Sequence, residues 1–87
     1  MIERLVATLR ELSRAGALDL GDPATRRLVA DCADALRLEL DCMQQALAPA
    51  EREALHALHE VIEHPVGRER ELQEAAQRAR MAIAGTR

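Results

Sequence analysis

Residues 24–47 read ATRRLVADCADALRLELDCMQQAL, a pattern that predicts one long helix around which the rest of the chain is arranged. Asp22 is a favoured N-cap residue, and Pro23 suits the first helical position, where its missing N–H would have no partner. Pro49 closes the other end, because the residue before a proline is pushed out of the helical region. We therefore expect a central helix over about residues 24–47.

The apolar face of this predicted helix is wide. At about 100° per residue, one sector about 80° wide contains several apolar side chains, namely Val29, Cys32, Leu36, Leu40, Met43 and Leu47. Further apolar positions widen the arc to about 200°, far more than a helix packed on a single neighbour needs. These further positions are Leu28, Ala35, Leu38 and Cys42. Such a helix requires at least two neighbours, from its own chain or from another.

Glu39 interrupts this apolar arc. A carboxylate in such a place must be paired, displaced to the edge or left at an interface, because burying an unpaired charge is costly. Two interpretations remain open. Glu39 either extends its head to water or to an arginine of a neighbouring helix, or it makes a specificity contact between helices. No second carboxylate, nucleophile or base is placed to work with it, so we do not expect a catalytic acid.

Three shorter helices are predicted to surround the central one. The first covers about residues 2–15, with Gly16 at its C′ position. The second covers about residues 50–64 and the third about residues 68–84, capped by Gly85. Short links between four alternating helices predict a single all-α domain over residues 1–87, a small antiparallel helical bundle of three to four helices with a long central helix.

The composition indicates a thin hydrophobic core. The chain has 87 residues and no aromatic residue, and 17 of its hydrophobic residues are alanine. Alanine favours helix but buries little apolar surface, and a domain of this size is marginally stable. Association supplies the burial that such a small core lacks. We therefore expect a homodimer or a complex with a protein partner.

The charge pattern disfavours nucleic acid as the main partner. The 15 acidic residues outnumber the 12 basic residues, all of them arginine, and the net charge is −3. Phosphate binding draws on clustered positive charge. One alternative function stays open: a nucleic-acid-binding regulator whose C-terminal helix contacts phosphates through Arg68, Arg70, Arg78 and Arg80. The acidic total and the lack of a helix-turn-helix pattern weigh against it.

A group of histidines suggests a third, less favoured function. His56, His59 and Glu63 project within about 60° of one another, a spacing that could hold zinc. Glu53-x-x-His56 also has the form used in di-iron bundles, but no second such pair exists. These residues point away from the apolar face of their helix. We interpret them as a solvated polar surface and expect neither a metal nor another cofactor.

The two cysteines favour a reducing compartment. Cys32 and Cys42 are ten residues apart, about 15 Å along one helix, so they cannot bridge each other. Unpaired thiols are typical of the cytoplasm, which we expect as the location; an intermolecular disulfide remains the alternative. Met1–Leu12 lacks the apolar run of a signal peptide, and we expect no membrane-spanning segment.

Motifs of enzymatic chemistry are absent from the sequence. It has no glycine-rich phosphate loop and no Cys-x-x-Cys, and Ser13 is its only serine. We therefore expect no catalysis and no small-molecule substrate. The sequence predicts a protein–protein interaction module of the small adaptor, chaperone, inhibitor or regulator type that uses the apolar face of its central helix. The expected interface residues are Val29, Leu36, Leu38, Glu39, Leu40, Met43 and Leu47.

Overall fold

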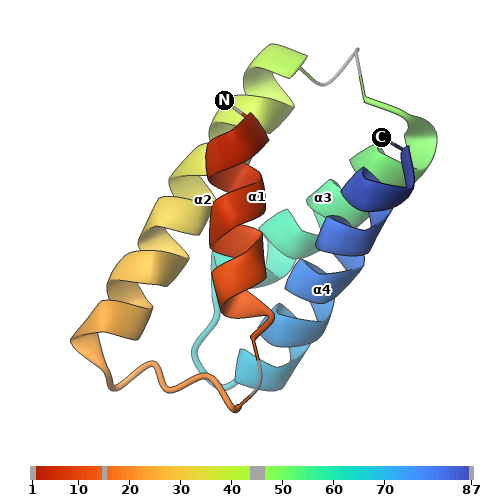
Figure 1. The fold of residues 1–87 in the computed structure, drawn as a ribbon. Coiled ribbons are helices and arrows are strands. Elements are labelled where there is room, and N and C mark those ends of the chain that lie inside the picture. Colours follow the sequence, from red (N-terminus) through yellow and green to blue (C-terminus); the bar gives the residue numbers. More distant parts are fainter. Residues whose placement is uncertain (1, 15, 44–46, 87) are drawn as a thin grey trace.

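The computed structural model describes residues 2–14, 16–43 and 47–86, and these ranges contain four α-helices and no strand (Figure 1). The side chains of Ile2, Met43 and Thr86 lie outside this description. The predicted all-α bundle is confirmed. Its helices are α1 (Ile2–Leu12), α2 (Pro23–Met43), α3 (Pro49–Ile62) and α4 (Glu69–Thr86).

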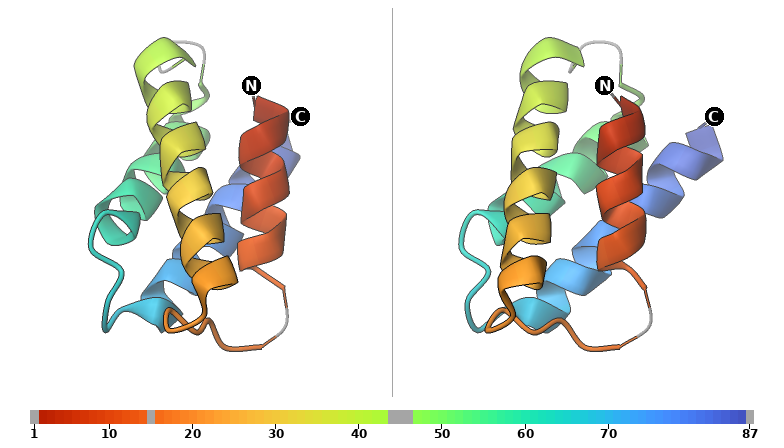
Figure 2. Two further views of the ribbon diagram at one scale, coloured as in Figure 1. Left: turned by 90° about the vertical axis from the view of Figure 1, so that its left-hand side faces the viewer. Right: turned by 60° about the vertical axis from the view of Figure 1, so that its left-hand side comes forward.

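The four helices form a ring in which each packs against two neighbours. α1 and α3 lie on opposite sides of the bundle, and each of them contacts both α2 and α4. Their directions alternate, so that the links after α1 and α3 lie at one end and the link after α2 at the other (Figures 1 and 2). Two neighbours of the same chain therefore cover the middle of the wide apolar arc of α2, while Leu38 and Cys42 at its edge stay exposed.

Leucines from all four helices fill the centre. Those with no exposed surface are Leu5, Leu9, Leu12, Leu36, Leu55, Leu58 and Leu72. α4 adds mostly small side chains to the core, as predicted, and Ala76 and Ala79 are completely buried. Leu18 and Leu20, in the link between α1 and α2, are partly buried against the same core. They tuck under the bundle end as their apolar character predicts.

The central helix starts close to its predicted position, but its predicted last residue is not helical. The carbonyl of Asp22 accepts the backbone N–H of Arg26 at 3.0 Å, and its carboxylate accepts the Thr25 hydroxyl at 3.0 Å. Asp22 therefore occupies the N-cap position. The described part of α2 reaches Met43, and residues 44–46 of the predicted helix lie outside the described residues. Leu47, the predicted last residue, is not helical; it lies before α3 and is only 6 % exposed. Leu47 reaches the core from the link rather than from the helix.

The ends of α1 and α4 also differ from the predictions. α1 stops at Leu12, three residues early, and the hydroxyl of Ser13 donates to the carbonyl of Leu9 at 2.7 Å. Such a side-chain bond competes with the helical backbone pattern. The predicted cap at Gly85 is wrong, because α4 continues through that residue. In the described part of the chain, only Gly16 and Gly67 have a positive φ, +107° and +79°.

Candidate interaction surfaces

Most of the predicted interface lies inside the bundle. Val29, Leu36 and Leu40 are 6 %, 0 % and 7 % exposed, and Leu47 is buried with them in one core. α1 and α3 of the same chain cover this face of α2. A second chain could reach these side chains only if the bundle opened, so in this fold they act as core.

The other predicted interface residues have different environments. Leu38 is 42 % exposed on the outer side of α2, whereas Glu39 is only 2 % exposed. Within the described residues, the Glu39 carboxylate has no hydrogen-bond or ion-pair partner. The arginine pairing considered for Glu39 is thus not found among these residues. The side chain of Met43, at the end of α2, lies outside the described residues.

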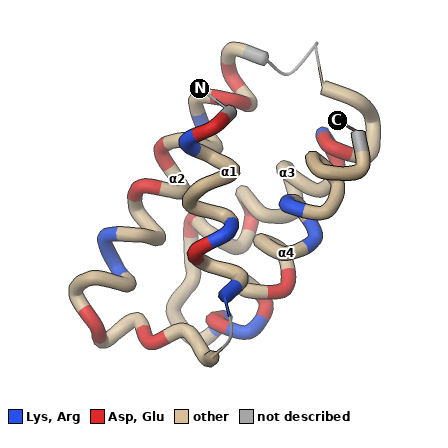
Figure 3. Tube along the Cα trace, viewed as in Figure 1, with Lys and Arg blue, Asp and Glu red and all other residues tan. Residues whose placement is uncertain are grey.

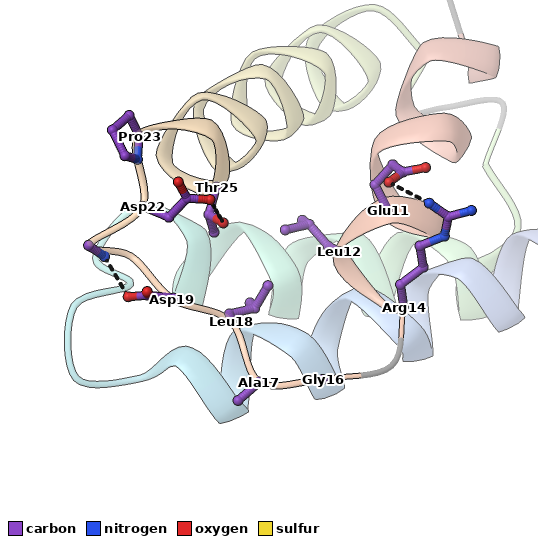
Figure 4. A pocket seen from close by; sticks show the side chains of 11 residues that line it. Glu11, Leu12, Arg14, Gly16, Ala17, Leu18, Asp19, Asp22, Pro23 and Thr25 are labelled. Atoms are coloured by element: carbon purple, nitrogen blue, oxygen red, sulfur yellow. Dashed lines mark hydrogen bonds and ion pairs between the residues drawn. The ribbon is translucent and has the colours of Figure 1, made fainter.

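A pocket of about 640 Å³ opens beneath the link between α1 and α2 (Figure 4). Its polar groups are already bound by the chain itself. Asp19 accepts the backbone N–H two residues later at 2.9 Å, and Asp22 accepts the Thr25 hydroxyl at 3.0 Å. Arg14 pairs with Glu11 at 3.2 Å. We therefore assign no ligand to this pocket.

A depression of about 420 Å³ lies between α2 and the link that joins α3 to α4. We call it the α2 depression, and its floor is apolar because Val29, Ala33 and Ile62 are nearly completely buried there. At its edge, the side chain of Val66 is 85 % exposed. Its full lining is Leu20, Arg26, Val29, Ala30, Ala33, Arg37, Ile62, Glu63, Pro65 and Val66. Val66 is thus a single exposed apolar residue beside an apolar floor, with charged residues among the lining.

Two arginines flank the α2 depression, and only one is available to a partner. Arg37 donates from Nε and Nη2 to the two carboxylate oxygens of Glu63, both at 2.8 Å, and from Nη1 to Asp34 at 3.0 Å. The guanidinium of Arg26 forms no hydrogen bond or ion pair with any other described residue. Arg26 can therefore bind an external carboxylate, which guanidinium groups engage through paired hydrogen bonds.

The pair of Arg37 and Glu63 joins α2 to α3, and we call it the clasp. The hydrogen bonds that Arg37 donates to Glu63 lower the pKa of the Glu63 carboxyl and raise the pKa of the Arg37 guanidinium. His59 also approaches Glu63, with its Nε2 3.1 Å from a carboxylate oxygen. The two partners are 26 residues apart in the sequence. No local pattern indicates such a pair, and sequence reasoning did not find it.

The arginines of α4 do not form a continuous basic surface. Arg68, directly before α4, and Arg70, within it, each pair with a glutamate of α4, at 2.8 Å and 3.2 Å. Arg80 donates to the hydroxyl of Ser13 at 3.4 Å, while Arg78 lies on the side towards α3. Positive and negative residues are mixed in the first half of α4, as Figure 3 shows, and only the second half carries arginines without acidic residues, Arg78 and Arg80. This arrangement gives the nucleic-acid alternative no phosphate-binding strip.

The histidines of α3 do not assemble a metal site with their neighbours. His59 contacts Glu63, whose two oxygens already accept hydrogen bonds from Arg37. Over the ranges that the structure describes, no three His, Cys, Asp or Glu side chains are grouped as metal ligands. The metal hypothesis through His56 and His59 thus gains no support from the geometry.

Comparison of the chain with known protein families, with curated proteins and with solved structures finds no match. Within the described residues, no helix combines the length and the apolar character that crossing a bilayer requires.

Proposed function

We propose that the chain is a non-catalytic protein-binding module, of the small adaptor, chaperone or inhibitor type. A segment of another protein binds in the α2 depression. The observation that carries this proposal is Val66, 85 % exposed beside the apolar floor of Val29 and Ala33. Covering this surface would remove apolar area from water. The central helix keeps the binding role predicted for it, but uses the side that α3 leaves open rather than the buried seam.

Arg26 defines the chemistry of the partner segment. Its guanidinium lines the α2 depression and has no partner among the described residues. A bound segment would place a bulky apolar residue on the floor and an aspartate or glutamate near Arg26. Arginine suits this contact because its planar group binds a carboxylate through two hydrogen bonds.

The states of two potential nucleophiles support a non-catalytic role. The Ser13 hydroxyl donates to the carbonyl of Leu9 at 2.7 Å. Burial raises the pKa of the Cys32 thiol to about 11, which suppresses the reactive thiolate. We also place the protein in the cytoplasm, because Cys32 and Cys42 are both free thiols and such thiols persist in a reducing compartment.

A selection from a random-peptide library tests the proposal. The full chain is the bait, and peptides that also bind the double variant Arg26→Glu/Val66→Asp are removed. We expect enriched peptides to carry a bulky apolar residue close to an acidic one. Their affinity for the wild-type chain should be in the range of about 1–100 µM, typical of short recognition segments that must become ordered on binding.

Single variants then test the site. Val66→Asp and Arg26→Glu should each weaken binding of the selected peptides at least about tenfold, because each removes one half of the proposed recognition. Arg27→Glu is the matched control, since Arg27 is exposed on the same helix but does not line the depression. Failure to enrich any peptide, or equal binding to wild type and double variant, rules out this surface.

A further inference from the structure

We infer that a second copy of this chain docks on the groove between α3 and α4, forming a two-fold symmetric dimer. This groove has a volume of about 800 Å³, and we call it the α3–α4 groove. The α2 depression shares no lining residue with it. The inference is therefore independent of the proposed function and adds self-association to it.

The shape of the α3–α4 groove is self-complementary. Its α3 side is lined by Ala50, Ala54 and Ala57, which present only methyl groups. On its α4 side, the long side chain of Met81 is 66 % exposed. A two-fold contact brings the same patch together twice, so that each patch needs both a projection and a recess. Met81 of each copy would pack on the alanines of the other, and methionine adapts readily to such a surface.

The charges of the α3–α4 groove are self-complementary as well. Glu53 lines it from α3 and Arg78 from α4, and neither forms an ion pair or side-chain hydrogen bond with another described residue. Glu74, by contrast, is already held by Arg70 at 3.2 Å. A two-fold axis through the groove would place Glu53 of each copy opposite Arg78 of the other. One free negative and one free positive group thus give two identical attractive pairs, which favours a second copy over an unrelated partner.

The thin core gives the chain a reason to associate. α4 contributes only Leu72 and Ile83 as large side chains to the core; its other buried residues are Ala75, Ala76 and Ala79, which bury little apolar area. Met81 is left in water by the single chain. Docking a second copy would bury Met81 and its alanine neighbours, which is the association that small domains use to increase their stability.

The first experiment is sedimentation equilibrium of the full chain from about 1 to 500 µM, a range that brackets weak and moderate affinities. Reductant is present to prevent disulfide pairing through the exposed Cys42. We expect a monomer–dimer equilibrium. Met81→Asp should raise the dissociation constant at least about tenfold without unfolding the chain, because Met81 is an exposed side chain at the proposed centre. A wild-type chain that stays monomeric throughout overturns the inference, and the groove then belongs to another partner.

A charge-reversal experiment tests the two-fold pairing. Glu53→Arg and Arg78→Glu should each weaken homodimers, because like charges then face each other twice. An equimolar mixture of the two variants should form a heterodimer, since both of its contacts again join opposite charges. The double variant Glu53→Arg/Arg78→Glu should dimerise like wild type. A mixture that associates no better than either variant alone contradicts this geometry.

Val66→Asp separates this inference from the proposed function. It should leave the dimer unchanged, because Val66 lies outside the α3–α4 groove, but it should weaken binding of the selected peptides at least about tenfold. Met81→Asp should do the reverse. A Val66→Asp chain that loses its dimer would overturn the assignment of the dimer to the α3–α4 groove.

Discussion

Arg37 and Glu63 join α2 to α3 through two hydrogen bonds of 2.8 Å, although both side chains are partly exposed to water. Exposed ion pairs generally contribute little, because water screens them and their side chains must be ordered. Here the forked geometry and the third bond to Asp34, at 3.0 Å, fix the guanidinium in place. The clasp also forms one wall of the α2 depression, so that its integrity affects both stability and the shape of that site.

The lowered pKa of Glu63 predicts an acid-sensitive contribution to stability. The folded chain favours the carboxylate, so the contribution is present above the unfolded pKa of about 4.3 and is lost as pH falls through the folded pKa. Glu63→Gln should therefore lower the melting temperature at about pH 7, and its difference from wild type should shrink as the pH falls below about 4.3. Thermal melts across this range measure it, with the exposed Glu60→Gln on the same helix as control. A difference that persists unchanged in acid contradicts the assignment.

The two cysteines should react at very different rates. Cys32 is completely buried and its pKa is raised to about 11, so that only about one thiol in a thousand is ionised at pH 8. Cys42 is exposed. We expect iodoacetamide to modify Cys42 at least about 100-fold faster, because it needs an accessible thiolate. Mass spectrometry of timed digests measures both sites in the native chain, with a urea-unfolded sample as control. Similar native rates would show that the bundle opens readily around Cys32.

Gly67 and Gly85, near the two ends of α4, have different backbone conformations. The link from α3 to α4 passes through Gly67, whose φ of +79° is a conformation that side chains with a Cβ disfavour. Gly85 is helical, and a Cβ added there would meet nothing within 4 Å. One glycine is thus required by its backbone conformation, and the other is a weak point in α4.

Alanine substitutions at these two glycines should have opposite effects. Gly67→Ala should lower the free energy of unfolding by about 1–2 kcal/mol, because alanine is strained at positive φ. Gly85→Ala should raise it by up to about 0.5–1 kcal/mol, since alanine is the better helix former. Urea unfolding of both variants beside wild type measures the pair. A loss of stability at Gly85→Ala would show that α4 is not continuous there.

As a whole, the molecule is a ring of four helices with its core closed within one chain. Leu36, which the wide arc of α2 suggested for an interface, is 0 % exposed and belongs to the same cluster as Leu5 and Leu58. The surfaces proposed for partners are the α2 depression and the α3–α4 groove. Each is lined by two elements of the chain, and neither uses the buried face of α2 around Leu36.

Leu36→Ala tests whether this core belongs to a single chain. It should lower the free energy of unfolding by about 2–5 kcal/mol, because it leaves a cavity in packed surroundings. Leu38→Ala, at a position 42 % exposed on the same helix, should cost less than about 1 kcal/mol. Unfolding is measured at about 2 and 200 µM protein, far apart enough for mass action to act on a dimer. A Leu36→Ala effect that changes with concentration would place Leu36 between chains.

Local patterns in the sequence were sufficient to predict the four helices and most of the core. A repeat of apolar residues every three to four positions identifies the apolar face of each helix, and Leu58 and Leu72 are buried accordingly. Leu36 is buried in the same core, although we expected it at an interface. The start of α2 was predictable because a cap needs only the residues next to it, here Asp22 followed by proline. Each of these features depends on interactions within a few residues, which the sequence displays directly.

Only the tertiary structure decided what covers the central helix. The apolar arc of α2 shows how much surface must be buried, but the arc is the same whether α1 and α3 or a second chain covers it. The clasp and the α2 depression are each formed by segments that lie far apart in the sequence but close together in space. Local sequence patterns do not predict which distant segments will meet. Leu47 also reaches the core from outside a helix, a position that its apolar spacing in the sequence does not indicate.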